Sequence, residues 1–385
     1  MFFGMDGMMS ADRPATRLAT RLAFFVAGFG IACWAPLVPF AKARLQIDDA
    51  MLGLLLLCIG GGSVAAMLAT GPLTARFGSR PVIVASGSLL AVILPFLAIA
   101  ETPLALGAVL LVFGGALGSL DVAVNVHAVE VERASGVPLM SGFHALFSIG
   151  GFAGAGLMTL FLSLEVDTLA ATLICAALML AAMLAARPRL LATRGAEDGP
   201  LFVRPQGIVL LLSILAMVTF LAEGAMLDWS ALLITQGGLV DVKQGGVGYI
   251  LFAIAMTTGR LLGDRLVARI GDYRTLLGGG VVAVLGFVVL LAVPLAPVAL
   301  GGFVLIGLGA SNLVPVLFRR AGSQSNMPPA LAIGALTTLG YAGILVGPAG
   351  IGVVAKAVGL PAAFWILAAL LLLVPLTARR VTRGA

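Results

Sequence analysis

The sequence predicts an all-α integral membrane protein, with twelve transmembrane helices in two pseudo-symmetric halves of six. Three observations lead to this prediction: an apolar composition, the number of apolar runs long enough to span a bilayer, and a basic loop that occurs twice. The chain is 61% hydrophobic and only 10% charged, with a mean hydropathy of +1.14. Because about a quarter of the residues in a typical soluble domain are charged, we expect lipid to be the solvent of this chain.

Twelve apolar runs reach the length of about 20 residues that an α-helix needs to cross the hydrocarbon core. Proline helps to separate them, as at Pro103 and Pro297, because it lacks the backbone donor that would continue a helix. We expect membrane-spanning helices over residues 21–41, 50–70, 80–100, 103–127, 138–163, 167–186, 207–235, 246–267, 274–293, 297–318, 329–354 and 360–378.

The longest polar stretch, residues 187–206, contains four arginines and falls at the midpoint of the chain. We interpret it as a cytoplasmic linker between a first half over 21–186 and a second half over 207–378. Residues 1–20 are then a polar and disordered cytoplasmic tail, and residues 379–385 a second cytoplasmic tail.

Basic residues predict the orientation of the chain. With both termini in the cytoplasm, 19 of the 23 lysines and arginines fall on the cytoplasmic side, including Arg260, Arg265, Arg269 and Arg274. The positive-inside rule therefore predicts a multi-pass protein of the bacterial inner membrane with both termini cytoplasmic.

The basic loop that occurs twice is Ala75-Arg76-Phe77-Gly78 and Ala268-Arg269-Ile270-Gly271. The two copies lie 193 residues apart in a chain of 385. A repeat of half the chain length in so apolar a sequence is typical of transporters built from two similar halves.

Several other function classes lack support in the sequence. The three cysteines, Cys33, Cys58 and Cys175, occur singly in apolar runs, which favours packed thiols over a metal site. The two histidines form no HExxH motif and no P-loop is present, so we expect no enzyme activity, no metal and no cofactor. The predicted partners are a small-molecule substrate, protons and the bilayer, with no nucleic acid and a monomeric state.

With its two six-helix halves, the chain resembles the major facilitator superfamily over its whole length. In that family the loop after the second helix carries a glycine, an Asp-Arg pair, a second glycine and a basic residue. Four positions of this chain match that gating motif, and Ala75 stands where the family has aspartate. The matching residues are Gly71, Arg76, Gly78 and Arg80.

The equivalent loop of the second half carries Asp264, Arg269 and Gly271. The resemblance implies that this loop also belongs to the gate, and that Asp264 partly substitutes for the missing acid. Within the family, residues 141–151 and 223–230 are similar to the fucose-permease-like branch of proton symporters.

Ionisable residues inside a membrane span are candidates for function, because a charge at mid-membrane costs about 2.5–3.5 kcal/mol on insertion scales. Glu223 is the strongest candidate for proton coupling, since a carboxyl group can bind and release a proton; the alternative is that it ties its helix to a neighbour. Asp228 lies nearer the outer end, where it either has a function or marks the interface. Asp121 and His144 are predicted at similar depth, as a proton site or as a pair that fixes helix packing.

Five polar or aromatic residues are candidates for binding the substrate. Trp34 and Trp229 are expected to stack on a sugar ring, or else to mark the membrane interface. The remaining candidates are Asn125, which can donate and accept hydrogen bonds, Asn312 and Tyr341. His127 is expected to be solvated near the cytoplasmic end of its helix.

The sequence therefore predicts a secondary active transporter, with proton-coupled symport of a small, sugar-like solute as the favoured function. The alternative is a proton-driven exporter of drugs or metabolites. Drug antiporters resemble this chain in fold, but they usually carry a Gly-Pro motif on the fifth helix, where this chain has Gly150-Gly151 and Gly154. This difference favours the symporter.

Overall fold

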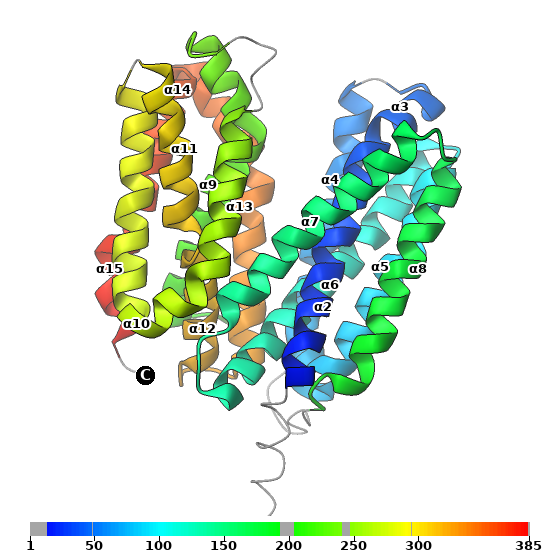
Figure 1. The fold of residues 1–385 in the computed structure, drawn as a ribbon, viewed down its shortest axis with the longest axis horizontal. Coiled ribbons are helices and arrows are strands. Elements are labelled where there is room, and N and C mark those ends of the chain that lie inside the picture. Colours follow the sequence, from blue (N-terminus) through cyan, green and yellow to red (C-terminus); the bar gives the residue numbers. More distant parts are fainter. Residues whose placement is uncertain (1–13, 48, 193–203, 241–246, 294, 384–385) are drawn as a thin grey trace, which may run out of the picture. The chain divides into compact units, whose positions relative to one another are not determined.

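The computed structural model describes residues 14–47, 49–192, 204–240, 247–293 and 295–383, and within these ranges it is helical with no β-strand (Figure 1). The helices of the first half are α2 (Pro14–Trp34), α3 (Val38–Leu45), α4 (Asp49–Phe77), α5 (Ser79–Ile99), α6 (Pro103–Ser135), α7 (Met140–Ser163) and α8 (Thr168–Ala186). Those that follow are α9 (Gly207–Gln236), α10 (Val247–Ala292), α11 (Ala296–Ala310), α12 (Leu313–Ser323), α13 (Pro329–Val358), α14 (Leu360–Leu371) and α15 (Leu373–Thr382). Two short 3-10 turns, Ala35–Leu37 and Arg187–Arg189, join or extend these helices.

The described residues contain ten helices long and apolar enough to cross a membrane, and one bent pair formed by Pro329–Leu345 and Gly350–Val358. α10 contains 46 residues, which is roughly 69 Å of helix and twice the thickness of a bilayer core. Its backbone leaves the helical conformation at Gly271 (φ 78°, ψ 168°), so α10 supplies two spans. Each of the twelve predicted spans thus has a counterpart, and the predicted all-α fold is confirmed.

The chain forms two compact units. The first contains Met1–Gly136 and Phe143–Val203, and the second contains Arg204–Ala385 together with the short segment Val137–Gly142. The segment 137–142, which includes the first residues of α7, therefore packs with the second unit although it belongs to the first half of the sequence.

Glycines allow close helix packing in the first unit. α4 packs against α6, and α5 packs against both α6 and α8. A methyl group added at Gly62 would collide with the backbone carbonyl of Leu111, and one added at Gly28 would collide with that of Phe147. Helix backbones meet directly at these points, as is typical of helix packing in lipid.

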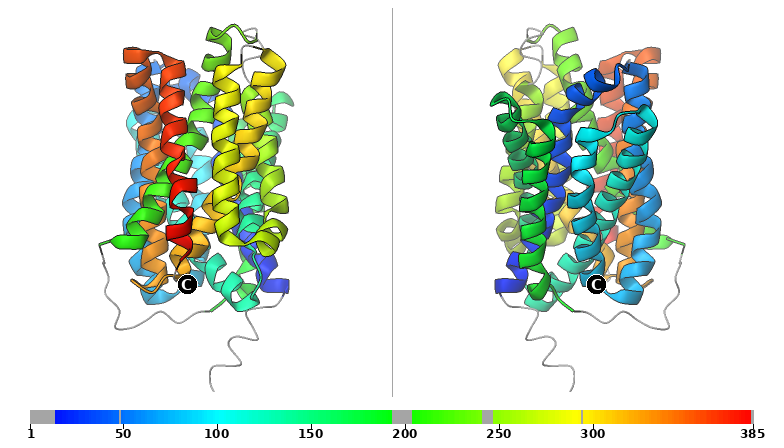
Figure 2. Two further views of the ribbon diagram at one scale, coloured as in Figure 1. Left: turned by 90° about the vertical axis from the view of Figure 1, so that its left-hand side faces the viewer. Right: turned by 90° about the vertical axis from the view of Figure 1, so that its right-hand side faces the viewer.

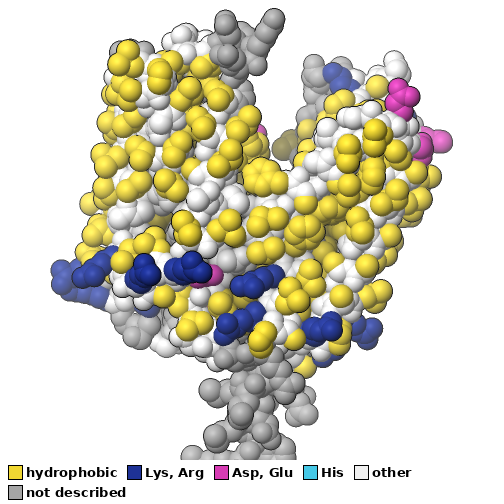
Figure 3. All heavy atoms as spheres, viewed as in Figure 1, with side chains coloured by type: hydrophobic (Ala, Val, Ile, Leu, Met, Phe, Trp, Pro, Cys, Tyr) yellow, Lys and Arg dark blue, Asp and Glu magenta, His cyan; other side chains and the backbone are white. Residues whose placement is uncertain are grey.

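In the second unit, α10 packs along α11 and α9 along α13, and the first of these pairs lies side by side in two views (Figures 1 and 2). In each unit apolar side chains cover the visible flank, and lysine and arginine gather at one end (Figure 3). This is the end where α2 begins in the first unit and the end where α15 finishes in the second. This pattern is that of a lipid-facing surface with a polar edge.

The helices at both ends of the chain are longer than predicted. α2 begins at Pro14, so residues 14–20 are not part of a disordered tail: Thr20 is fully buried and donates its hydroxyl to Thr16. α15 continues to Thr382 rather than ending at 378, and the carbonyl oxygen of Val381 accepts a hydrogen bond from Arg320 at 3.0 Å. The hydropathy of the sequence falls where a helix leaves the lipid, whereas the backbone hydrogen bonds of the helix continue beyond that point.

Candidate functional site

Glu223 of α9 forms an ion pair with Arg260 of α10 inside the second unit. One guanidinium nitrogen, Nη2, lies 3.3 Å from Oε2 and 3.5 Å from Oε1 of the carboxylate. The side chains of Arg260 and Glu223 are 8% and 20% exposed. A single nitrogen shared between two oxygens is a looser contact than the bidentate fork that arginine can make. The pair is therefore part-buried, and its contact is looser than a bidentate one.

Arg260 is not part of the cytoplasmic basic cluster in which the sequence analysis placed it. It lies eleven residues before the break at Gly271, or roughly 16 Å along the helix axis, which is near the middle of a hydrocarbon core about 30 Å thick. A charge at this depth is itself a candidate for function. The signal that would have identified it is its place inside an apolar run, beside Gly259.

Tyr249 lies near the Glu223–Arg260 pair and also near Asp228. Tyr249 belongs to the first turns of α10 and lies within electrostatic range of Glu223, Arg260 and Asp228, and its ring packs 6.2 Å from that of Phe252. Asp228 is exposed. The pair thus has a phenol in its surroundings, and this phenol has a second carboxylate near it.

In the first unit, Asn125 links Asp121 and His144. The side-chain amide of Asn125 donates to the carbonyl oxygen of Asp121 at 2.9 Å and lies 3.4 Å from Oδ1 of its carboxylate. Nε2 of His144 lies 3.1 Å from Oδ1 of Asn125, so Nε2 carries the proton in this arrangement. All three residues are at least nine-tenths buried. The two residues predicted to lie at similar depth therefore meet through a third.

His127 is fully buried, which contradicts the expectation that it is solvated. Its Nδ1 lies 3.2 Å from the hydroxyl of Thr20 on α2, and its Nε2 accepts a hydrogen bond at 2.9 Å from the backbone of Leu191. The reason is that α6 continues to Ser135 instead of ending at residue 127. His127 therefore joins α2, α6 and the start of the linker.

The two tryptophans have one feature in common. The indole nitrogens of Trp34 in the first unit and Trp229 in the second are both buried, and neither has a hydrogen-bond partner among the described residues. Trp229 packs near Gly352, where an added methyl group would lie 3.3 Å from the indole ring. A buried donor without a partner is costly, so the two indole nitrogens are unsatisfied donors among the described residues.

Asn312 and Tyr341 have different surroundings. The amide of Asn312, at the break between α11 and α12, donates to the carbonyl oxygen of Gly259 at 3.1 Å, while its Oδ1 has no partner among the described residues. Tyr341 of α13 meets Phe220 of α9 edge to face, with ring centroids 6.0 Å apart. Asn312 therefore connects two helices, and Tyr341 takes part in an aromatic contact.

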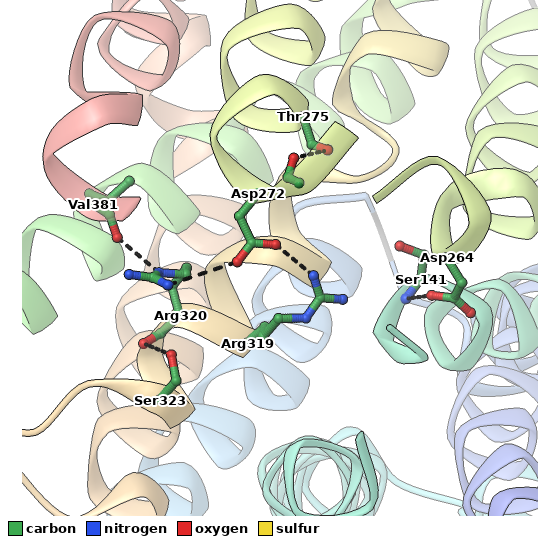
Figure 4. Close-up of polar contacts among 9 residues, drawn as sticks. Ser141, Asp264, Asp272, Thr275, Arg319, Arg320, Ser323 and Val381 are labelled. Carbon is green, nitrogen blue, oxygen red and sulfur yellow. Dashed lines mark hydrogen bonds and ion pairs between the residues drawn. The ribbon is translucent and has the colours of Figure 1, made fainter. Parts of the chain in front are cut away.

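Asp264 accepts hydrogen bonds from the first turn of α7 (Figure 4). Its Oδ1 lies 2.9 Å from the backbone nitrogen of Ser141 and its Oδ2 lies 2.9 Å from that of Gly142. The first N–H groups of a helix have no partner within the helix, and a carboxylate there is favoured by the helix dipole. Asp264 therefore holds the start of α7 to α10.

The residues predicted to form the gating loops lie in or near two tight connections. Gly78 (φ 81°, ψ 163°) joins α4 to α5, and Gly271 has nearly the same conformation within α10; only glycine adopts this region readily. Arg76 and Arg269 are exposed beside these glycines. Gly71 is buried in α4, and Arg80 follows Gly78 in the first turn of α5.

Asp272, directly after Gly271, forms an ion pair with Arg319 of α12 at 2.7 Å (Figure 4). The neighbouring Arg320 lies 4.0 Å from the same carboxylate and also holds α15. These contacts fix the basic end of the second unit. Among the described residues, no cluster of three or more histidine, cysteine, aspartate or glutamate side chains is arranged to hold a metal ion.

Residues 21–327 match the family described as the Major Facilitator Superfamily. An uncharacterized MFS-type transporter of Yersinia pestis is 51% identical over 368 residues, which cover 95% of this chain and 96% of that protein. Membrane protein MosC of Rhizobium meliloti is 31% identical over 350 residues, covering 90% and 86%.

Solved structures show the same fold. The transporter FucP in its outward conformation superposes with a TM-score of 0.77 at 16% identity, over 97% of this chain and 100% of that one. The human organic anion transporter MFSD10 superposes with a TM-score of 0.75 at 18% identity, over 95% and 100%.

Proposed function

Because the chain belongs to the major facilitator superfamily and is therefore a membrane transporter rather than an enzyme, we propose that it couples the import of a small, polar, sugar-like solute to the entry of protons. The observation that carries this proposal is the buried contact between Glu223 and Arg260. The solved fucose:proton symporter FucP of E. coli has the same fold, which is compatible with the proposal.

The ion pair supplies a physical link between a proton and a solute. While Glu223 is a carboxylate, it balances the charge of Arg260. When Glu223 binds a proton, the buried guanidinium loses an anionic partner, which is unfavourable at mid-membrane. Hydroxyl oxygens of a solute then offer the guanidinium new acceptors. Proton binding and solute binding favour each other by this exchange, which is the coupling that a symporter needs.

The remaining candidates provide groups for recognising the solute. Trp34 and Trp229 offer indole N–H donors and ring faces, and the Asp121–Asn125–His144 network offers an amide that donates and accepts. In this proposal Asp121, His144 and Asp228 take part in proton coupling. Asn125, Asn312 and Tyr341 belong to the surface that binds the solute. Aromatic rings with hydrogen-bonding groups beside them suit a solute with hydroxyl groups and an apolar ring face.

We further propose that the protein works as a monomer in the bacterial inner membrane with both termini in the cytoplasm. The gathering of basic residues at the ends of α2 and α15 supports this orientation, and the relatives from Yersinia and Rhizobium are bacterial proteins.

The experiment is a proton-flux assay on the purified protein in liposomes, with a panel of sugars and polyols. We expect one solute class to trigger proton entry. Glu223→Gln should lose proton-driven accumulation and keep solute exchange, because the amide cannot titrate but still fills the site. Glu101→Gln is the matched control, since Glu101 is an exposed glutamate outside this site.

Full proton-driven uptake by Glu223→Gln would contradict the assignment of the coupling residue. If none of the sugars and polyols triggers proton movement, and lipophilic cations trigger proton release when they are added, the result would instead identify a proton-driven exporter.

A further inference from the structure

Arg80 and Arg187 line one cavity in the first unit. The cavity has a volume of about 470 Å³, and its other lining residues are Pro81, Val84 and Ala85 of α5. We refer to these five residues as the α5 groove. Arg80 lies in the first turn of α5, directly after Gly78, and Arg187 directly follows the last residue of α8. The groove is therefore at the basic end of the unit, where the spans meet the polar edge.

The charge of the α5 groove is unbalanced. It is lined by two arginines and no acid, and neither arginine has a hydrogen bond or ion pair with any described residue. Glu130 accepts a hydrogen bond at 3.1 Å from the hydroxyl of Ser79, the residue before Arg80. Two guanidinium groups at one cavity favour an anion between them, and arginine suits phosphate in particular.

An apolar stripe leads away from the groove along α5. Pro81, Ala85, Leu89, Val92 and Phe96 are all exposed, and their spacing of three or four residues places them on one face of the helix. The stripe covers sixteen residues and rises roughly 22 Å from Pro81 to Phe96, which is longer than one leaflet of a hydrocarbon core about 30 Å thick. A ligand with a phosphate at one end and a long apolar chain fits this surface.

The second unit has a similar cavity after its own glycine break. Arg274 lines a cavity of about 230 Å³ whose walls include Leu266, Ile270 and Leu308. Arg80 and Arg274 each stand two or three residues after the glycine of the repeated basic loop, Gly78 and Gly271. The repeat thus places an arginine beside an apolar cavity in both halves.

We propose that the α5 groove binds an acidic phospholipid from the leaflet on the side of the chain termini. Arg80 and Arg187 hold the phosphate of the headgroup, and the acyl chains lie along the stripe from Pro81 to Phe96. Basic pockets at the edge of the bilayer recognise anionic headgroups in this way. The site is at the basic end of the first unit and shares Arg80 with the predicted gating motif, but it contains none of the residues proposed to bind the proton or the solute.

The test is lipid binding by the purified full-length protein in detergent, measured by native mass spectrometry with phosphatidylglycerol and with phosphatidylcholine of the same acyl chains. We expect the wild type to prefer phosphatidylglycerol. The double variant Arg80→Gln/Arg187→Gln should bind it about thirtyfold more weakly and bind phosphatidylcholine unchanged. The control Arg189→Gln/Arg379→Gln removes the same charge from exposed arginines outside the groove and should bind both lipids as the wild type does.

A second variant tests the shape of the α5 groove without changing its charge. Ala85→Trp fills the groove and keeps both arginines, so it should also weaken the binding of phosphatidylglycerol. Equal binding of the two lipids by the wild type, or undiminished binding of phosphatidylglycerol by the double variant, would overturn the proposal.

One further outcome would also overturn it. If inorganic phosphate bound as tightly as phosphatidylglycerol, the apolar stripe would contribute nothing to binding.

Discussion

Oδ1 of Asp264 lies 2.9 Å from the backbone nitrogen of Ser141, so a carboxylate on α10 caps a helix that begins 124 residues earlier in the chain. Most capping residues directly precede the helix they cap; Asp167, which caps α8, is an example in this protein. The long-range cap explains why the segment 137–142 packs with the second unit. It also provides an acid at the second basic loop, whereas the first loop has Ala75.

Removal of the long-range cap should loosen the start of α7. We expect Asp264→Ala to destabilise the protein by about 1–2 kcal/mol and to speed amide hydrogen exchange at Ser141 and Gly142. Thermal unfolding and hydrogen-exchange mass spectrometry measure the two effects. Asp167→Ala is the control, because it removes a local cap and should speed exchange only at Leu169 and Ala170. Unchanged exchange at Ser141 in Asp264→Ala would show that the cap does not hold this turn.

Adjacent glycines of α4 should respond in opposite ways to a methyl group. At Gly62 the methyl would meet the carbonyl oxygen of Leu111, whereas at Gly61 it would meet nothing within 4 Å. We expect Gly62→Ala to cost about 1–3 kcal/mol by forcing α4 and α6 apart. Gly61→Ala should be neutral or should stabilise the helix by about 0.5–1 kcal/mol. Thermal unfolding in one detergent compares the pair, and equal melting temperatures would disprove the backbone contact.

The indole nitrogen of Trp229 should contribute to solute binding and not to the stability of the fold. Because this nitrogen is buried without a partner among the described residues, Trp229→Phe loses no protein hydrogen bond and keeps a ring against Gly352. We expect an unchanged melting temperature and a KM raised roughly fivefold, the effect of one hydrogen bond worth about 1 kcal/mol. Transport kinetics with the identified solute provide the measurement. An unchanged KM would show that Nε1 of Trp229 does not bind the solute.

His127 should contribute to stability through two hydrogen bonds. His127→Ala leaves the buried hydroxyl of Thr20 and the backbone N–H of Leu191 without this partner, and it opens a cavity, so we expect a loss of about 3 kcal/mol. Thr20→Val removes only one of the two contacts and should cost about 1 kcal/mol. Urea or thermal unfolding of both single variants and of the double variant measures their coupling. Additive effects would show that the two side chains do not interact.

The sequence was sufficient to predict the twelve spans, because hydropathy and chain length determine how often an apolar chain crosses lipid. It also predicts a carboxylate inside a span at Glu223, and the role of this residue in proton coupling stays a prediction. Its partner Arg260 lies inside the predicted span 246–267, but it was counted with the cytoplasmic cluster because it lies close in the sequence to Arg265 and Arg269. The break at Gly271 falls between the predicted spans 246–267 and 274–293, whereas the backbone conformation at this glycine is seen only in the structure.

The contacts of His127 and Asn125 show a second limit of sequence reasoning. His127 was expected in solvent because the predicted span ended there, yet α6 continues for two more turns to Ser135. Asn125 was predicted one turn from Asp121, which helical spacing determines. The contact between Asn125 and His144 depends on how α7 packs against α6. This packing is determined by side chains that are far apart in the sequence.

The helices that meet at Gly78, and those that meet at Gly271, are joined by a single glycine and cannot move independently of each other. One residue in a conformation open mainly to glycine carries the whole change of direction, so a helix on either side cannot shift along its axis without pulling its neighbour. Epitope tags, protease sites or fluorescent labels inserted at these two points would separate paired helices.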